Sequence, residues 1–274
     1  MIDQELVFDV GAHMGEDTDL YLKLGYRVIA VEASPQMLQL LHERFSNEIE
    51  SQRLVIVGAA LVPADYEENT VTFFVNQHNS EWSSISNEFV ERNRKRNNHA
   101  VSEVTVPIVK CADLFERYGT PVYLKVDVEG ADQCALDAVC EHQEKPNFFS
   151  IESSKTDLSE VIFEIRRLFD AGYKRFAVVQ QAGHGGSRMS VRSLTGECIE
   201  YKFNRASSGA FGDDLPSSSW MSADDAIANY KKIFVEYKLF GDQRPKLIRG
   251  VGVYLGRLRG SACPGWYDTH ARLD

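Results

Sequence analysis

Short apolar runs of strand character alternate with helical patterns through the first 180 residues of this chain. The helical patterns carry ordinary end signals: residues 34–45 open with Ser34 before Pro35, and residues 16–25 close on Gly25. Buried strands that alternate with helices form βαβ units, in which parallel strands lie between layers of helix. We therefore predict an α/β protein with a doubly wound, mostly parallel sheet. The strand-like runs are 5–10, 27–33, 53–61, 121–130, 147–154 and 173–180.

Two regions depart from this rhythm. Residues 71–75 and 104–109 predict extra strands inserted into the alternating pattern. Beyond a glycine-rich loop at 180–190, a strand is expected at 198–203, and residues 222–241 predict one amphipathic helix capped by Ser222. We therefore predict a cofactor-binding domain over 1–205, with inserted strands within 71–109. Residues 206–274 are predicted to be a C-terminal helical extension that forms a lid on the same domain.

Charge and cysteine content narrow the range of functions. The 274 residues include 40 Asp and Glu against 30 Lys and Arg, and the net charge of −10 disfavours nucleic-acid binding. Five cysteines without a CxxC pair are typical of reduced thiols in a cytoplasmic protein. The N-terminus has no signal-peptide pattern, and no apolar stretch approaches the ~18–20 residues of a membrane span. Neither nucleic acid nor membrane is therefore expected as a partner.

The first strand runs into a glycine turn, FDVGAHMGEDT at residues 8–18, which is typical of a nucleotide-cofactor site. A dinucleotide fingerprint needs a second glycine where this chain has His13, and a pyrophosphate there would face Glu16 and Asp17. S-adenosylmethionine has no phosphate and carries two positive charges, so these carboxylates favour it. Glu32, which follows Gly11 by 21 residues, suits the ribose of either cofactor.

Neighbouring residues of the turn have expected roles in this interpretation. Asp9 is expected to face the ammonium group of the cofactor, directly or through water. The turn N–H groups, or Thr18, are expected to receive its carboxylate. Gly11 and Gly15 are expected to leave room for a cofactor that lies flat against the backbone.

These motifs, in this order, resemble the FkbM family of S-adenosylmethionine-dependent methyltransferases. The resemblance covers roughly residues 5–180, and His13 stands where the family commonly has asparagine. It implies a class I, Rossmann-like methyltransferase that methylates a hydroxyl of a sugar, glycan or natural-product small molecule. The motifs are FDVGAHMGEDT (8–18), VIAVEASP (28–35), VGAAL (57–61) and YLKVDVEGAD (123–132).

Polar and small residues follow the ends of several predicted strands, which is where ligands bind in open α/β sheets. We expect Asp127 and Glu152 to act in catalysis, together with His184 in the glycine-rich loop, and His270 is a weaker candidate base. The residues expected to bind the cofactor are Asp9, Gly11, Ala12, His13, Gly15, Asp17, Thr18, Glu32, Ala33, Ala59, Ala60 and Asp127.

Three alternatives stay open at this point. The acceptor hydroxyl is expected to lose its proton to a side chain, but a divalent cation held by Asp127, Glu152 and Ser153 is a less favoured solution. A dinucleotide-dependent oxidoreductase is permitted by Glu32. A non-catalytic module that binds S-adenosylmethionine would show the same cofactor motifs.

Overall fold

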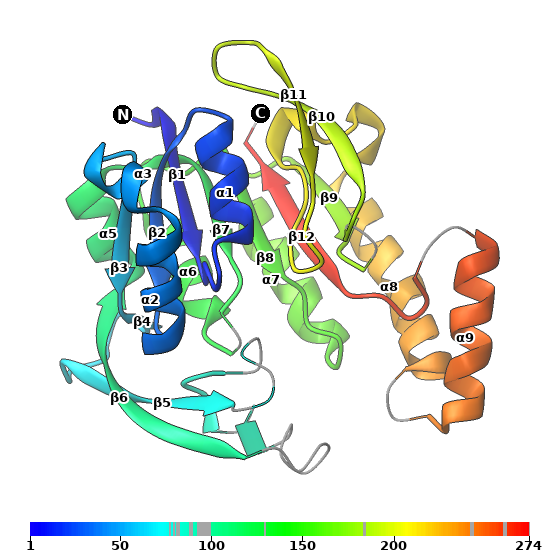
Figure 1. Cartoon of the computed structure of the whole chain (residues 1–274). Helices are drawn as coiled ribbons and strands as arrows, with labels where there is room; N and C mark the ends of the chain where they lie inside the picture. The colour runs from blue at the N-terminus through cyan, green and yellow to red at the C-terminus, as the bar shows by residue number, and fades with distance from the viewer. Residues whose placement is uncertain are drawn as a thin grey trace. The chain divides into compact units, whose positions relative to one another are not determined.

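The computed structural model describes the chain apart from residues 77, 79, 81–82, 88–89, 92–99, 129, 183–184, 242–243, 260–261 and 274, and apart from the side chains of residues 257 and 259. The chain forms two compact units (Figure 1). Unit 1 comprises Met1–Asn147 and Arg192–Glu197, and unit 2 comprises Phe148–Val191 and Cys198–Asp274. The predicted division of the chain at residue 206 stays a prediction.

Four parallel strands form the sheet of unit 1, in the order β3-β2-β1-β7. The last five residues of β1 and all residues of β2 except Arg27 are buried, as expected of strands covered on both faces. The predicted α/β fold with a mostly parallel sheet is confirmed. The elements are β1 (Asp3–Val10), α1 (Glu16–Lys23), β2 (Arg27–Glu32), α2 (Pro35–Arg44), α3 (Ser46–Glu50), β3 (Leu54–Gly58), α5 (Cys111–Tyr118), β7 (Pro121–Val126) and α6 (Asp132–Glu141).

An inserted three-stranded sheet interrupts this pattern, with β6 (Val101–Lys110) between β4 (Ala60–Val62) and β5 (Thr70–Asn76). Strands β5 and β6 lie where the sequence predicts extra strands. The single strand predicted over 53–61 is wrong in one respect. The chain leaves the parallel sheet after Gly58, and β4 joins the inserted sheet, where Ala60 packs in a small core with Phe73 and Val106.

Unit 2 contains an antiparallel strand that the sequence analysis does not predict. Strand β12 (Tyr267–Arg272) lies between β8 (Phe148–Glu152) and β9 (Arg175–Gln180) and runs antiparallel to both. The predicted loop at 180–190 likewise contains the start of a strand. The other elements are α7 (Leu158–Asp170), β10 (Arg188–Arg192), β11 (Cys198–Lys202), α8 (Ala223–Phe240) and α9 (Lys246–Arg259).

Two of the predicted helix ends are capped as expected, whereas Ser34 stands at the N-cap of α2 but its side chain forms no capping hydrogen bond. The Ser222 side chain accepts a hydrogen bond from the N–H of Asp225 at the start of α8. Gly25 follows α1 with a left-handed backbone (φ +98°), as a helix-ending glycine should. In the part of the chain that is described, the helices are all too short or too polar to cross a membrane.

Candidate functional site

The glycine turn joins the end of β1 at Val10 to the start of α1 at Glu16. Three of its residues have left-handed backbone: Gly11 (φ +89°), His13 (φ +48°) and Gly15 (φ +77°). Glycine adopts this conformation without strain, and asparagine, aspartate and histidine tolerate it better than other residues do. The backbone therefore accounts for a histidine at the position where the resembling family has asparagine.

Protein atoms lie against both glycines of the turn. A Cβ atom on Gly11 would lie 1.9 Å from the main-chain oxygen of Asp127, and one on Gly15 would lie 2.4 Å from the Phe45 ring. From the sequence, these glycines are expected to leave room for a cofactor that lies against the backbone. In the structure the protein itself fills these positions, so the glycines let the ends of β1 and β7 and the side of α2 approach closely.

The N–H groups at the start of the turn donate hydrogen bonds inside the protein. Those of Gly11 and Ala12 donate to the main-chain oxygen of Val31, at 2.9 and 3.0 Å. That of His13 donates to the carboxylate of Glu32, 2.8 Å away. An anion site needs several N–H groups directed at one ligand. The turn is thus not arranged to receive a pyrophosphate, and the expected capture of a carboxylate by these groups finds no support.

Glu32, at the end of β2, is held in place from two sides. One carboxylate oxygen accepts the N–H of His13, and the other accepts the N–H of Ser34 at 2.7 Å. Burial raises the pKa of the Glu32 carboxyl above its ordinary value, and these two hydrogen bonds offset only part of that effect. Each oxygen retains acceptor capacity, since a carboxylate has about four lone-pair positions. Glu32 is thus preoriented to accept two further hydrogen bonds.

Small residues border Glu32 where β3 ends and β4 begins. Ala59 and Ala60 are buried, and the N–H of Ala59 donates to the main-chain oxygen of Glu32. Ala33 packs against the core cluster that contains Ala60. The predicted small-residue edge is therefore present beside Glu32.

A buried lysine, Lys125 on β7, lies among three aspartates. Its Nζ atom is 3.2 Å from Asp17, 3.4 Å from Asp127 and 3.5 Å from Asp9. Burial opposes the charge of Lys125, but the three carboxylates outweigh burial and raise its pKa well above the ordinary value. Asp9 also accepts the hydroxyl hydrogen bond of Thr18 at 2.6 Å. We call these residues the Lys125 cluster.

The members of the Lys125 cluster differ in their access to solvent. Lys125, Asp9 and Asp17 are buried, whereas the Asp127 side chain is 40% exposed. The Thr18 hydroxyl donates to Asp9 inside unit 1, and the expected contact of both residues with the cofactor stays a prediction. Asp127 is thus the member of this cluster that is open to a ligand.

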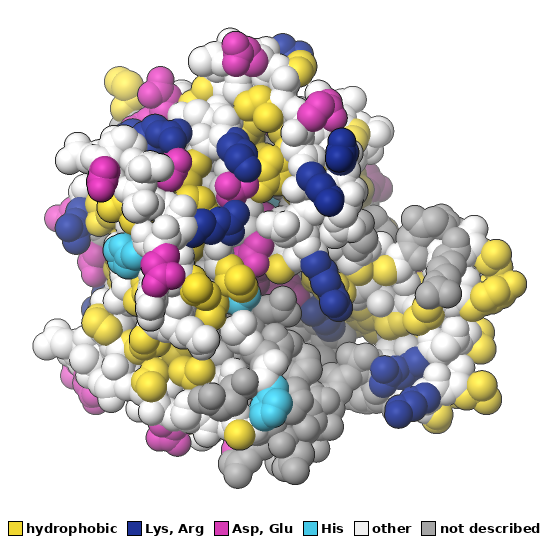
Figure 2. Space-filling view, viewed as in Figure 1, with side chains coloured by type: hydrophobic (Ala, Val, Ile, Leu, Met, Phe, Trp, Pro, Cys, Tyr) yellow, Lys and Arg dark blue, Asp and Glu magenta, His cyan; other side chains and the backbone are white. Residues whose placement is uncertain are grey.

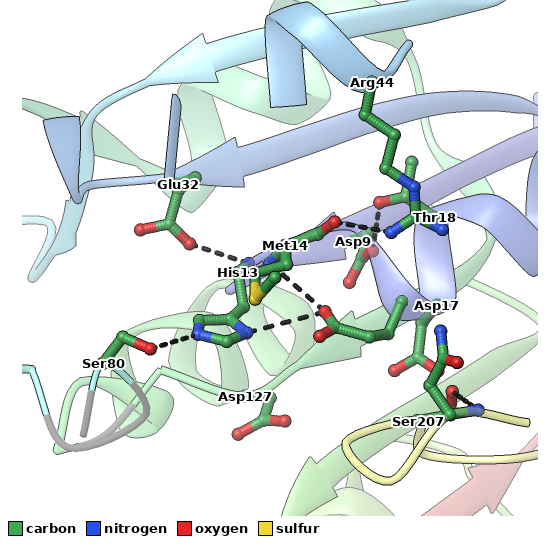
Figure 3. A network of polar contacts seen from close by, with 12 residues as sticks. Asp9, His13, Met14, Asp17, Thr18, Glu32, Arg44, Ser80, Asp127 and Ser207 are labelled. Atoms are coloured by element: carbon green, nitrogen blue, oxygen red, sulfur yellow. Dashed lines mark hydrogen bonds and ion pairs between the residues drawn. The ribbon is translucent and has the colours of Figure 1, made fainter. Parts of the chain in front are cut away.

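His13 extends the turn toward the inserted segment (Figure 3). Its Nε2 atom lies 2.7 Å from the Ser80 hydroxyl, and its Nδ1 atom lies 3.5 Å from the carboxylate of Glu16. Burial acts to raise the pKa of Glu16, but the hydrogen bond and charge of His13 prevail and lower it. Ser80 cannot be predicted from the sequence as a partner of His13, because nothing local links it to a turn 67 residues earlier.

The strand ends place the two principal carboxylates on either side of the turn. Strand β1 lies between β2 and β7, so Glu32 and Asp127 flank the end of β1 (Figure 3). The N–H of Asp127 donates to the main-chain oxygen of Val10, which fixes the backbone there. The predicted convergence of Asp9, Glu32 and Asp127 at one sheet edge is thus present within unit 1.

Glu152 and Ser153 lie at the end of β8 in unit 2. The carboxylate of Glu152 forms an ion pair with Lys155, whose Nζ atom is 2.7 Å away. The Ser153 hydroxyl forms a closed, buried set of hydrogen bonds with Tyr230 and Thr269, at 2.7 to 2.8 Å. Ser153 is therefore engaged within the protein, and a joint role of Glu152 with Asp127 stays a prediction.

The remaining predicted site residues are placed less favourably or are not described. His270 lies inside β12 and is almost fully buried, which does not suit a base that must reach a substrate. His184 lies outside the described residues. Among the residues that are described, no three His, Cys, Asp or Glu side chains are grouped as metal ligands.

Comparison with known proteins identifies a family. A family model described as "Methyltransferase FkbM domain" matches residues 9–175. This range contains the glycine turn, Glu32, the small residues near 59 and the KVDVEG strand, so the predicted family and the prediction of an S-adenosylmethionine-dependent methyltransferase are confirmed. The oxidoreductase alternative is thereby set aside. The comparison with curated proteins gives no match.

Several solved structures are similar to the chain. The precorrin-6y C5,15-methyltransferase of Geobacter metallireducens GS-15 is 11% identical, with 74% of this chain and 77% of that chain covered and a TM-score of 0.38. The methyltransferase FkbM of Methylobacillus flagellatus KT is 20% identical, with 61% and 38% covered and a TM-score of 0.36. The glycopeptide N-methyltransferase MtfA, complexed with S-adenosylmethionine, is 12% identical, with 99% and 88% covered and a TM-score of 0.33. At these TM-scores the likenesses carry no weight, and the assignment rests on the family match.

Proposed function

This chain belongs to the family of FkbM methyltransferase domains, and we propose that it methylates a hydroxyl group of a sugar, glycan or natural-product small molecule with S-adenosylmethionine as methyl donor. The observation that carries the proposal is the pair of carboxylates, Glu32 and Asp127, that flank a turn without a free array of N–H groups. Such an edge suits a ligand that has a ribose and positive charge and lacks phosphate.

The residues of unit 1 fit this cofactor in sign of charge and in hydrogen bonding. Glu32 presents two oriented oxygens to the ribose hydroxyls. Lys125 supplies one positive charge against the three negative charges of its aspartates, so the cluster keeps a negative balance beside the turn. When bound, S-adenosylmethionine supplies a methyl group on a sulfonium, which makes the sulfur a good leaving group.

The acceptor then needs a group that takes its proton, because an uncharged hydroxyl is a poor nucleophile. Asp127 is the first candidate, because its side chain is half-exposed at a strand end. Its carboxylate lies 3.4 Å from Lys125 Nζ, and this ion pair positions it. A positioned base of this kind contributes about 10²–10⁴-fold to the rate. Glu152 and His184 remain further candidates. A divalent cation that lowers the hydroxyl pKa remains the less favoured alternative.

Two experiments test the proposal in sequence. Calorimetric titration with S-adenosylmethionine, S-adenosylhomocysteine and NAD is expected to give binding of the first two and none of NAD. Transfer of labelled methyl groups to a metabolite extract, followed by mass spectrometry, is then expected to give a methyl ether. A methylated amine as product would overturn the hydroxyl acceptor, and cofactor binding without any transfer would favour the non-catalytic module.

Three further proposals concern the C-terminal residues, the acceptor and the location of the protein. We propose that residues 206–274 act as a lid, that the acceptor is a small molecule or glycan, and that the protein is cytoplasmic. The cytoplasmic proposal rests on the five cysteines, all of which are described and none of which forms a disulfide. Activity assays on fractionated cells are the measurement that checks it.

A further inference from the structure

Helix α9 exposes one continuous apolar face. Its members recur at intervals of four, three and four residues, which brings them to one side of a helix with 3.6 residues per turn. Their side chains are 48% to 82% exposed. We call them the α9 apolar face: Leu247, Val251, Tyr254 and Leu258.

The opposite side of α9, which packs on α8, is made of small residues. Gly252 and Gly256 are buried, and a Cβ atom on Gly252 would lie 2.6 Å from Cβ of Phe240 at the end of α8. A surface helix ordinarily turns its large apolar residues toward its own protein. Here the helix turns two glycines inward and leaves most of its large apolar residues outside, so packing within unit 2 does not explain them.

Helix α8 exposes apolar side chains as well. Val235 is 55% exposed, and Leu239, four residues later, is 50% exposed. Figure 2 shows hydrophobic side chains gathered along α9, with Lys and Arg beside them. Contiguous exposed apolar patches of this kind mark interaction surfaces.

The charge of α9 indicates the kind of partner. In a chain of net charge −10, the helix sequence KLIRGVGVYLGRLR contains Lys246 and three arginines and no acidic residue. Lys246 and Arg249 are exposed, as are the residues of the apolar face. A helix that combines exposed apolar residues with basic residues alone is typical of helices that lie on anionic membrane surfaces.

We propose that α9 binds an anionic membrane surface, with its apolar face inserted at the boundary between headgroups and acyl chains. The negative charge elsewhere on the chain acts weakly at this site, because screening reduces it beyond ~8 Å at physiological ionic strength. A second copy of the chain is a poorer occupant, since a two-fold pairing of α9 with itself would bring like charges together.

This inference does not depend on the proposed methyl transfer. It revises the expectation that no membrane partner exists, which rested on the absence of a spanning segment. With 14 residues, α9 is about 21 Å long and too short to cross a hydrocarbon core of ~30 Å. The helix is therefore proposed to lie along the surface.

Vesicle flotation of the full chain tests the proposal. We expect binding to vesicles of phosphatidylcholine mixed with phosphatidylserine, and much weaker binding to phosphatidylcholine alone. The variant Leu247→Ser/Leu258→Ser should lower the partition coefficient by on the order of tenfold for each leucine removed from the interface. The variant Lys246→Gln/Arg249→Gln should lower it about fivefold per charge, on anionic vesicles only.

The matched control is Leu194→Ser, which changes a leucine that is 41% exposed in unit 1 and should leave partition unchanged. Circular dichroism checks that each variant keeps its helix content. Failure of the native chain to float with anionic vesicles would overturn the proposal, as would equal binding to both vesicle types. If Leu247→Ser/Leu258→Ser changed the oligomeric state on gel filtration but left vesicle binding unchanged, the α9 apolar face would instead be a contact between two copies of the chain.

Discussion

Replacing Lys125 by methionine removes the one positive charge of the Lys125 cluster while keeping a side chain of similar length. Asp9 and Asp17, both almost fully buried, would then lose their nearest cation. Asp127 is half-exposed and would be hydrated instead. Removing one partner of a buried ion pair costs about 3–5 kcal/mol, because the other charge stays buried without compensation.

The lysine at position 155 provides a matched control. Lys155 lies only 2.7 Å from Glu152, closer than Lys125 is to any of its three aspartates, but its side chain is 44% exposed. Exposed pairs contribute about 0–1 kcal/mol. We therefore expect Lys155→Met to lower the free energy of unfolding by at most ~1 kcal/mol, and Lys125→Met to lower it several times more.

Denaturant unfolding at neutral pH measures both variants. The double variant Lys125→Met/Asp9→Asn should recover part of the lost stability, because it removes one of the two buried carboxylates that lose their cation. Equal effects of the two single variants would refute the argument that burial, and not distance, decides the energy of these pairs. A loss below ~1 kcal/mol for Lys125→Met would refute it as well.

The dependence on pH gives a second check on the same residue. The pKa of Lys125 is raised in the folded protein, so its contribution is complete below the unfolded pKa of about 10.4 and is lost as pH rises through the folded value. As the pH is raised from neutral, the difference in stability between the native chain and Lys125→Met should thus persist and should shrink only in strong alkali. A difference that already shrinks when the pH is raised from ~7 to ~9, where lysine does not ordinarily titrate, would contradict the assignment.

Three further predictions concern the turn and its flanking carboxylates. In calorimetry, Glu32→Gln should bind S-adenosylmethionine on the order of tenfold to a hundredfold more weakly, because it loses charged acceptors. The native affinity should fall as pH is lowered through the raised pKa of Glu32, above the ordinary 4.5, and the variant should lack that dependence. Asp127→Asn should change cofactor affinity only modestly and lower turnover by ~10²-fold or more in a methyl-transfer assay. Near-native turnover would exclude Asp127 as the base, and loss of native activity on EDTA treatment with recovery on Mg²⁺ addition would favour the cation. Gly11→Ala should cost about 2–5 kcal/mol on denaturant unfolding, from backbone strain and from the 1.9 Å approach to Asp127. Gly119→Ala is its control, with φ +87° but no atom within 4 Å, and an equal cost there would assign the whole effect to strain.

The local pattern of the sequence was sufficient to predict most of the parallel sheet and the strand ends that carry Glu32 and Asp127. Apolar runs and capping residues predicted β1, β2 and β7 with their helices, and motif order predicted the family. Glu32 could be placed at a strand end because its position depends only on where β2 stops. These features are determined within a window of a few residues, so periodicity and turn chemistry predict them.

Tertiary structure decided the features that depend on residues far apart in the chain. Sequence alone did not show that Lys125 joins Asp9 and Asp17, or that Ser80 contacts His13, because the strand register and the path of the insert bring them together. It did not predict β12, whose pairing with β8 and β9 is set by hydrogen bonds to strands far earlier in the chain. Periodicity also cannot show which side of α9 faces the protein. That side is decided by the close approach of α8 and α9, which Gly252 permits at Phe240.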